Sequence, residues 1–352
     1  MDIIIGIMAF VVMLSVIVTV HEFGHLIAAK KFGVFCGEFS IGMGPLIYHF
    51  QGKETQYSLR ALPIGGFVSM AGEEDDTKKE IEVPFERTIN GIRWWQRIIV
   101  MLAGIIMNIV LAWIVFVLIF MVTGTRVDNS STTISSVELG SPAQKAGFQE
   151  GDEILSLTYE NGKKVTIDSS SDLRTEINLD PQTFIFEINR NGKIIKLSAT
   201  PIFDEKSESY LLGVSTESTL KGISKWEAVQ YGTMKTIDNS TLIFKSLGKL
   251  LQGKNLDQLS GPIGIYNVTQ KAFNTNILTY IQLFAIFSLN VGIFNAIPIP
   301  ILDGGRALIA LIERIVGRPI NQRFFEIIMY AGMVVLVGLM LFATWNDILR
   351  LF

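Results

Sequence analysis

Two histidines and a glutamate in the first apolar segment have the spacing of a metal site. The sequence His21-Glu22-Phe23-Gly24-His25 is an H-E-x-x-H motif. In a helix, positions i and i+4 lie on one face, so both imidazoles can reach one metal ion. Neutral imidazole suits zinc, and a catalytic zinc keeps an open position for water, whose pKa it lowers toward neutrality. An adjacent glutamate accepts the proton of that water, so the motif predicts metal-assisted hydrolysis with Glu22 as the general base.

The motif supplies two ligands, and the sequence offers one more carboxylate in an unusual setting. Residues 295–305 read NAIPIPILDGG. Pro298 and Pro300 cannot continue a helix, and a broken helix at membrane depth is tolerated only where it is buried in protein or lines a cavity. Asp303 is therefore the candidate third ligand. A simple helix end with an Asp-Gly turn also explains the prolines and glycines, but not their pairing with a metal motif.

The elements that must position these residues are strongly apolar. Of 352 residues, 49% are hydrophobic and 18% are charged, and the mean hydropathy is +0.40. An ordinary soluble domain is about one-quarter charged. The net charge of −3 gives no basic footprint for nucleic acid, and the single cysteine excludes a disulfide scaffold. Four segments without acidic or basic side chains are long enough to cross a bilayer: 3–20, 98–122, 277–294 and 327–343.

The positions of lysine and arginine predict an orientation in the membrane. Lys30 and Lys31 follow the first apolar segment, arginines precede the second, and more arginines separate the third from the fourth. If both termini face outward, every short basic loop lies on one side. This pattern predicts residues 30–97 and 304–323 in the cytoplasm and residues 125–276 outside. His21 and His25 then lie toward the cytoplasmic end of the first helix.

Residues 127–216 have the pattern of a separate β-rich domain. Predicted strands are 153–159, 183–189 and 194–199, a short helix is predicted at 170–178, and Asn-Gly turns follow two of the strands. The stretch 137–155, VELGSPAQKAGFQEGDEIL, resembles the signature of a PDZ domain, a module that takes an extended peptide as an added strand. A small β-rich domain without a peptide ligand is the alternative.

Three further features have more than one interpretation. Residues 225–251 form an amphipathic pattern, which predicts a helix lying on the outer membrane face or packed against the β-rich domain. Asn108 is a polar residue within the second apolar segment, where it braces the metal site or makes an ordinary bond between helices. The acidic run Glu73-Glu74-Asp75-Asp76 predicts a solvated loop without a catalytic role.

The two metal motifs together resemble the site-2 protease family of intramembrane zinc metalloproteases. HExxH lies in the first apolar segment, NxxPxPxLDGG follows a late one, and a PDZ-like insert lies between. The chain is most similar to the bacterial regulator-of-sigma-E protease branch, with room for one PDZ domain. Residues 39–50 and 57–72 resemble the membrane-associated β-hairpin region of that branch, and Ser260-Gly261-Pro262-Ile263-Gly264 resembles a segment before its third span.

The resemblance implies a role for each matching residue. His21, His25 and Asp303 would bind Zn2+, and Glu22 would activate the water. Asn295 would hold the substrate backbone, with Pro298 and Pro300 beside it. The hairpin region 38–70 would pair with the substrate in extended form, which lowers the cost of unwinding a helical peptide bond.

The resemblance also implies the setting of the enzyme. The chain would be a multi-pass protein of the bacterial cell membrane, in contact with membrane lipid. Its substrates would be single-span transmembrane proteins, such as anti-sigma factors already cut outside the membrane, or signal peptide remnants. Both termini and the PDZ domain would be extracytoplasmic, with the active site toward the cytoplasm.

These predictions combine into one architecture. It is an α-helical polytopic membrane protein of four transmembrane helices, with an inserted α+β PDZ domain and a membrane-associated β-hairpin region. The predicted divisions are the first span with HExxH (1–30), a cytoplasmic loop with the hairpin (31–97), the second span (98–124), the PDZ domain (125–220), an amphipathic helix and linker (221–276), the third span with the broken segment (277–305), and a cytoplasmic loop with the fourth span (306–352).

Two other functions are weaker. A membrane scaffold with a structural zinc site needs a fourth protein ligand, and no cysteine or spare histidine lies near the motif in sequence. A metal transporter needs further ligands along a path, where the spans offer only amides and hydroxyls.

Overall fold

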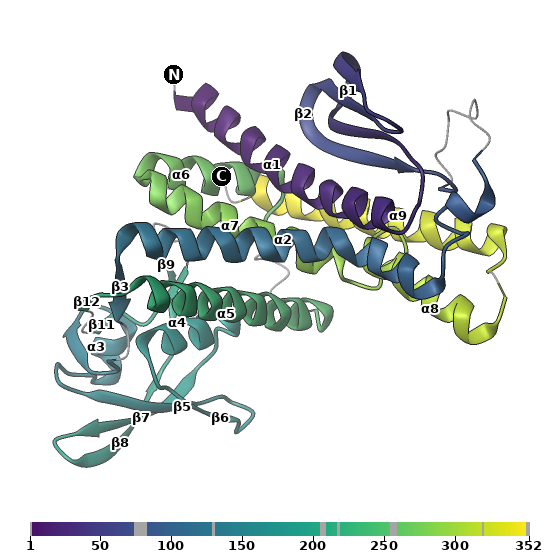
Figure 1. Cartoon of the computed structure of the whole chain (residues 1–352). Helices are drawn as coiled ribbons and strands as arrows, with labels where there is room; N and C mark the ends of the chain where they lie inside the picture. The colour runs from purple at the N-terminus through teal and green to yellow at the C-terminus, as the bar shows by residue number, and fades with distance from the viewer. Residues whose placement is uncertain are drawn as a thin grey trace. The chain divides into compact units, whose positions relative to one another are not determined.

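Four long helices carry the apolar segments of the sequence (Figure 1). The computed structural model describes residues 2–73, 83–128, 131–204, 209–216, 219–253, 259–318 and 320–349. The four helices are α1 (Asp2–Lys31), α2 (Trp94–Thr123), α7 (Ile277–Asn295) and α9 (Gln322–Leu349). Within the described residues, these are the four helices long and apolar enough to cross a membrane. The prediction of four apolar helices is confirmed.

The chain divides into two compact units. One consists of Met1–Ile119, Gln230–Phe244 and Leu256–Phe352, and the other of Phe120–Val229 and Lys245–Asn255. The first unit contains the apolar helices and both metal motifs. The second contains the β-rich segment.

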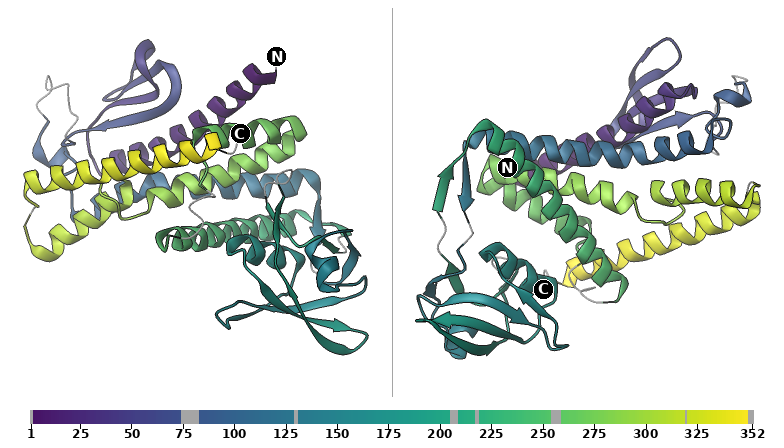
Figure 2. Two further views of the ribbon diagram at one scale, coloured as in Figure 1. Left: turned by 180° about the vertical axis from the view of Figure 1, so that it is seen from behind. Right: turned by 60° about the horizontal axis from the view of Figure 1, so that its bottom comes forward.

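The helices of the first unit run side by side (Figures 1 and 2). One buried cluster joins α1, α2 and α8 (Asp303–Val316) through Ala29, Val100 and Ala307. Another joins α2 and α7 through Ala112 and Leu289. The alanines at these contacts let the helix backbones approach closely, as in membrane helix bundles. The packing brings the H-E-x-x-H segment of α1 to the start of α8.

A long β-hairpin lies beside α1 in the first unit (Figure 1). Strand β1 (Cys36–Gln51) pairs antiparallel with β2 (Gln56–Met70). The register is curled, because Ser40 of β1 pairs with Ser58 near one end of β2 and with Phe67 near the other. Apolar side chains of β1 are exposed, with Ile47 at 65% and Tyr48 at 63%. The hairpin is therefore confirmed, and its exposed apolar surface suits contact with lipid.

The second unit has a four-stranded antiparallel sheet of order β6-β5-β7-β8 and two helices. Its core includes Leu157, Phe184 and Phe186, all fully buried. The sheet and helices are β5 (Glu153–Thr158), β6 (Lys164–Thr166), β7 (Phe184–Arg190), β8 (Lys193–Ala199), α3 (Pro142–Ala146) and α4 (Ser170–Leu179). Three short pairs complete the unit: β3 (Thr125–Asp128) with β12 (Thr219–Gly222), β4 (Ile134–Val137) with β11 (Val214–Thr216), and β9 (Ile202–Asp204) with β10 (Ser209–Leu211). The three predicted strands and the helix are present, whereas the short pairs were not predicted.

The amphipathic segment forms α5 (Lys225–Leu251), which begins with a capping box between Ser224 and Glu227. Within the first unit, α5 packs along α2, where Trp113 Nε1 donates a hydrogen bond of 2.9 Å to Thr233 Oγ1. Within the second unit, the last turns of α5 pair with α4, where Lys245 lies 3.6 Å from Glu176. The second contact supports packing against the β-rich domain, and the location on a membrane face stays a prediction.

Two regions predicted as linker or loop are helical. Helix α6 (Pro262–Thr275) begins with a proline in its first turn, a favoured position because its missing N–H has no intrahelical partner there. Helix α8 occupies most of the predicted loop between the third and fourth apolar segments. Its arginines indicated the cytoplasmic side of the membrane, and their alternation with apolar residues at helical spacing also fits an amphipathic helix. A short 3₁₀ helix, η1 (Phe85–Arg87), precedes α2.

Candidate active site

Helix α1 places the two motif histidines together in a buried position. His21 is 6% exposed and His25 is 5% exposed, and their ring centroids are 4.9 Å apart. The two Nε2 atoms lie 3.3 Å from each other. The i, i+4 spacing therefore brings both ring nitrogens to one point, as the sequence predicts.

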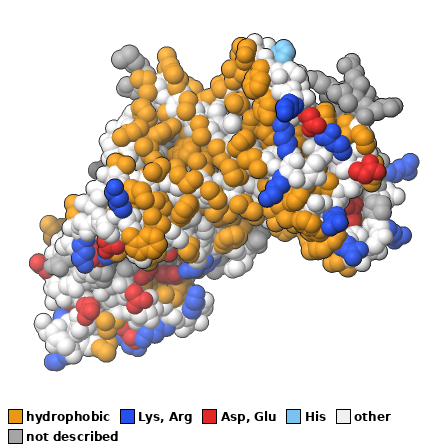
Figure 3. Space-filling view, viewed as in Figure 1, with side chains coloured by type: hydrophobic (Ala, Val, Ile, Leu, Met, Phe, Trp, Pro, Cys, Tyr) orange, Lys and Arg blue, Asp and Glu red, His pale blue; other side chains and the backbone are white. Residues whose placement is uncertain are grey.

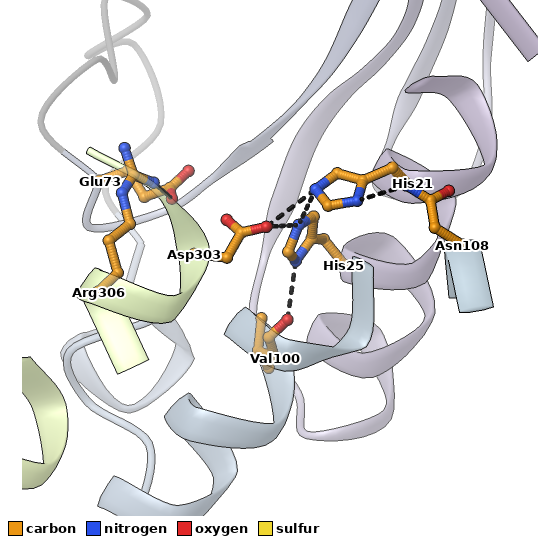
Figure 4. A network of polar contacts seen from close by, with 7 residues as sticks. All are labelled: His21, His25, Glu73, Val100, Asn108, Asp303 and Arg306. Atoms are coloured by element: carbon orange, nitrogen blue, oxygen red, sulfur yellow. Dashed lines mark hydrogen bonds and ion pairs between the residues drawn. The ribbon is translucent and has the colours of Figure 1, made fainter. Parts of the chain in front are cut away.

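Asp303 completes this cluster from the first turn of α8 (Figure 4). Its Oδ2 atom lies 2.9 Å from His21 Nε2 and 3.3 Å from His25 Nε2. The three ligand atoms lie within 4.8 Å of one another, so they could hold a metal ion. Two imidazoles and an ionised carboxylate are a donor set that fits zinc and leaves a position open.

Helix α2 supplies hydrogen-bond partners for the other nitrogen of each imidazole. His25 Nδ1 lies 2.8 Å from the Val100 carbonyl oxygen. A carbonyl only accepts, so Nδ1 carries the proton and Nε2 presents its lone pair toward Asp303. Metal-binding histidines are commonly oriented by such a partner.

Asn108 contacts the Nδ1 atom of His21, as the Val100 carbonyl contacts the Nδ1 atom of His25. Its amide Nδ2 lies 3.2 Å from His21 Nδ1, its Oδ1 has no hydrogen-bond partner among the described residues, and the side chain is fully buried. In this orientation the amide nitrogen donates to Nδ1, so the ring proton of His21 is on Nε2 and faces Asp303. A half-turn of the amide presents Oδ1 to Nδ1–H and leaves the Nε2 lone pair for a metal ion. Asn108 is thus in contact with the site, and one amide serves both tautomers of His21.

Glycines allow the surrounding elements to approach the cluster. A Cβ atom on Gly104 of α2 would lie 2.5 Å from His25 Nε2 and 2.8 Å from His21 Nε2. A Cβ atom on Gly24 of α1 would lie 2.5 Å from the Ala103 carbonyl oxygen. Any larger residue at Gly104 would push directly against the proposed ligand atoms. Gly104 was not predicted as a site residue, although its place one turn before Asn108 could have indicated it.

The broken segment between α7 and α8 fixes Asp303 at the start of a helix. Helix α7 ends at Asn295, Pro298 and Pro300 lie in the irregular segment, and Asp303 opens α8. A Cβ atom on Gly305 would lie 2.0 Å from the Ile299 carbonyl oxygen, so this position needs glycine. The prediction of a helix broken before Asp303 is confirmed. Asn295 is half-buried, and the hydrogen bonds and ion pairs described around the three clustered side chains do not include it.

Strand β2 lies against the motif glutamate. Glu22 follows His21 on α1 and is half-buried. The backbone of Val68 forms a hydrogen bond with its carboxylate, and a Cβ atom on Gly66 would lie 3.9 Å from Glu22 Cγ. Strand β1 pairs with one edge of this part of β2 through Ser40 and its neighbours. A backbone edge of the hairpin therefore lies beside the candidate catalytic base.

An ion pair one turn beyond Asp303 ties α8 to the loop after β2 (Figure 4). Arg306 Nη1 lies 3.1 Å from Glu73 Oε1. Burial raises the pKa of the Glu73 carboxyl, which the neighbouring guanidinium opposes. Glu73 thus lies in a loop, as predicted for 73–76, but it is half-buried and ion-paired rather than solvated, and the other three residues lie outside the described part of the chain.

Comparison with known proteins decides the family. Residues 9–339 match peptidase family M50. The chain belongs to peptidase family M50. The M50 match and the cluster of two histidines and an aspartate agree, and they confirm the resemblance to the site-2 proteases.

Bacterial relatives of this M50 chain are similar over nearly their whole length. The regulator of sigma-W protease RasP of Bacillus subtilis is 32% identical, with 98% of this chain and 99% of that protein aligned. The zinc metalloprotease RasP of Shouchella clausii is also 32% identical, again with 98% of this chain and 99% of that protein aligned. The probable protease eep of Enterococcus faecalis is 30% identical, with 98% and 99% aligned. The M50 chain is therefore a zinc metalloprotease, and its four apolar helices make it a multi-pass membrane protein.

Proposed function

We propose that this M50 chain is an intramembrane endopeptidase that cuts single-span membrane proteins within or beside their transmembrane segments. The observation that carries the proposal is the convergence of His21, His25 and Asp303 at the end of an apolar helix. Ionisable groups in that setting are costly unless they serve function. A protease site there acts on bonds that a soluble protease cannot reach.

The proposed ligands are His21, His25 and Asp303, and the proposed base is Glu22. When bound, zinc would lower the pKa of a water molecule and polarise the scissile carbonyl. The Glu22 carboxylate would take the proton from that water and later deliver it to the leaving amine. Val100 and Asn108 would hold the imidazoles with their Nε2 lone pairs toward the metal.

The edge of β2 near Val68 would hold the substrate in extended form. A peptide bond in a helix is shielded, and its carbonyl already accepts a hydrogen bond, so the substrate must unwind before it is cut. A strand edge replaces the lost hydrogen bonds. Asn295 would hold the substrate backbone, with Pro298 and Pro300 beside it.

The second unit would serve as one PDZ domain outside the cytoplasm. Its support is the sequence resemblance at 137–155 together with a β-sheet and two helices. Such a domain would favour substrates whose outer domain has already been trimmed. Anti-sigma factors and remnant signal peptides have this form, and the name of the Bacillus subtilis relative refers to sigma-W regulation.

Zinc content and cleavage test this proposal together. The purified full-length chain is expected to hold one zinc ion and to cut a single-span substrate reconstituted with it. The double variant His25→Ala with Asp303→Ala is expected to lose both zinc and cleavage. His49→Ala is the matched control, because the His49 side chain is exposed in the second half of β1, and this variant should keep both. Full zinc content in the double variant would overturn the ligand assignment.

A further inference from the structure

A cavity of about 750 Å³ lies in the first unit next to α8. Its walls come from the first turns of α2, the loop after β2, one face of α8 and the beginning of α9. It is lined by both charged and apolar side chains, and its cationic residues include Arg314 and Arg318. None of the three clustered ligand residues lines it. The cavity is therefore a different space from the one into which the three ligand side chains point.

The two faces of α8 indicate the depth of this cavity in the membrane. Arg306, Glu313 and Arg314 line the cavity from one face. The other face is apolar and exposed, with Ile315 at 76% and Val316 at 57%. A helix with one charged and one exposed apolar face lies in the plane of the membrane interface. The cavity then opens at the level of the lipid headgroups.

The charges in the cavity leave a cationic surplus. Arg97 pairs with Glu313 at 2.7 Å, and Arg306 pairs with Glu73 at 3.1 Å. Arg314 and Arg318 are exposed, and neither has an ion-pair partner in the part of the chain that the structure describes. Figure 3 shows basic side chains gathered at the end of the apolar surface where α8 lies. Two exposed guanidinium groups without an ion-pair partner among the described residues are suited to a phosphate group.

The remaining walls suit a hydrocarbon chain. Phe325 and Met329 line the cavity from α9, and Phe85 and Trp94 line it from the segment before α2 and its first residue. Phe85 is 66% exposed and Trp94 is 43% exposed. An inorganic phosphate ion gains nothing from such apolar walls, whereas a glycerophospholipid buries its acyl chains against them.

We propose that this cavity binds an anionic phospholipid, with its phosphate on Arg314 and Arg318 and an acyl chain along Phe325 and Met329. Basic pockets between membrane helices are suited to such headgroups. The bound lipid would hold α8 against the beginnings of α2 and α9. Because α8 opens with Asp303, lipid in this cavity stabilises the element that carries one proposed ligand.

Native mass spectrometry of the purified full-length protein tests the proposal. The protein is mixed with phosphatidylglycerol or phosphatidylcholine, and the bound lipid is counted at each concentration. Phosphatidylglycerol is expected to bind preferentially, and Arg314→Gln with Arg318→Gln is expected to weaken it about 30-fold, from the loss of two interfacial charges. The matched control is Arg93→Gln with Arg323→Gln, which removes two exposed arginines that do not line the cavity. The control should bind phosphatidylglycerol as the unchanged protein does.

Competition identifies the source of the phosphate group. Millimolar inorganic phosphate and an acidic peptide are each added to the lipid-bound protein, and neither is expected to displace phosphatidylglycerol. Displacement by inorganic phosphate would assign the site to a free anion, and displacement by the peptide would assign it to a protein segment. Equal binding of the two lipids, or equal loss in both double variants, would also overturn the proposal. Zinc content, measured on the same samples, shows that the metal site is intact in each.

Discussion

The glycine at position 104 provides a sharp test of the site geometry, through the substitution Gly104→Ala. The added Cβ atom would lie 2.5 Å from His25 Nε2 and 2.8 Å from His21 Nε2, whereas ordinary contacts begin at 3.4 Å. The His25 ring must therefore retreat by about 0.9 Å. That is more than the roughly 0.5 Å within which a functional site must be held. We expect the zinc affinity to fall by about 10- to 100-fold, as for other changes that misplace a metal-binding imidazole.

The assay is a competition titration of zinc against a chelating dye, carried out on the purified full-length protein. Gly338→Ala is the matched control, because Gly338 lies in apolar helix α9 and a Cβ atom there would have no heavy atom within 4 Å. The control should bind zinc as the unchanged protein does. If Gly104→Ala also binds zinc with unchanged affinity, the close packing of α2 against the two imidazoles is wrong.

Three further predictions concern positioning and stability. Asn108→Leu should weaken zinc binding about tenfold, because His21 loses the partner of its Nδ1 atom, and Asn108→Asp should restore part of it; equal affinities in a zinc titration would refute this role. Gly305→Ala should lower the cleavage rate, because its Cβ atom would displace the Ile299 carbonyl and with it Asp303, and rates within twofold of the unchanged enzyme would contradict the packing. Asp152→Asn should destabilise the second unit by about 2 kcal/mol, because it removes the charged partner of Arg190, whose Nε lies 2.7 Å from Asp152 Oδ1. The loss is measured by unfolding the full-length protein and using proteolysis within the second unit to report its unfolding.

The Asp152 pair also predicts a pH dependence of stability. Burial would raise the pKa of the Asp152 carboxyl, but Arg190 and the Gln149 backbone N–H hold it below its usual value. A carboxyl whose pKa is lowered by folding stabilises the protein above its unfolded pKa of about 3.9, and this stability is lost as the pH falls through the lower, folded value. The second unit should therefore lose stability below about pH 4. Asp152→Asn should flatten that part of the curve, and an unchanged curve would contradict the assignment.

Much of the site could be predicted from sequence because its strongest signals are local. The spacing of His21 and His25 specifies one helical face, and the prolines at 298 and 300 specify a break before Asp303. The meeting of these two segments depends on helix packing. A single sequence does not encode that packing in any short pattern. Asp303 was therefore predicted as the third ligand only from its unusual setting in the sequence.

The partners of the imidazoles were harder to predict for the same reason. The Val100 carbonyl is a backbone group, which leaves no signature in the residue type. Gly104 acts by lacking a side chain, so it reads as one more small residue in an apolar helix. Helix α8 lies in a segment predicted only as the connection between two spans, although Leu308, Leu311 and Ile315 follow helical spacing.

The most direct test of the central claim is the substitution Glu22→Gln, which removes the proposed base and leaves the proposed ligands in place. Zinc content and cleavage of a reconstituted single-span substrate are measured on the same preparation. One zinc ion per chain with cleavage lowered by about 100-fold or more is the predicted result. Cleavage at an undiminished rate would contradict the assignment of Glu22 and with it the proposed chemistry of the site.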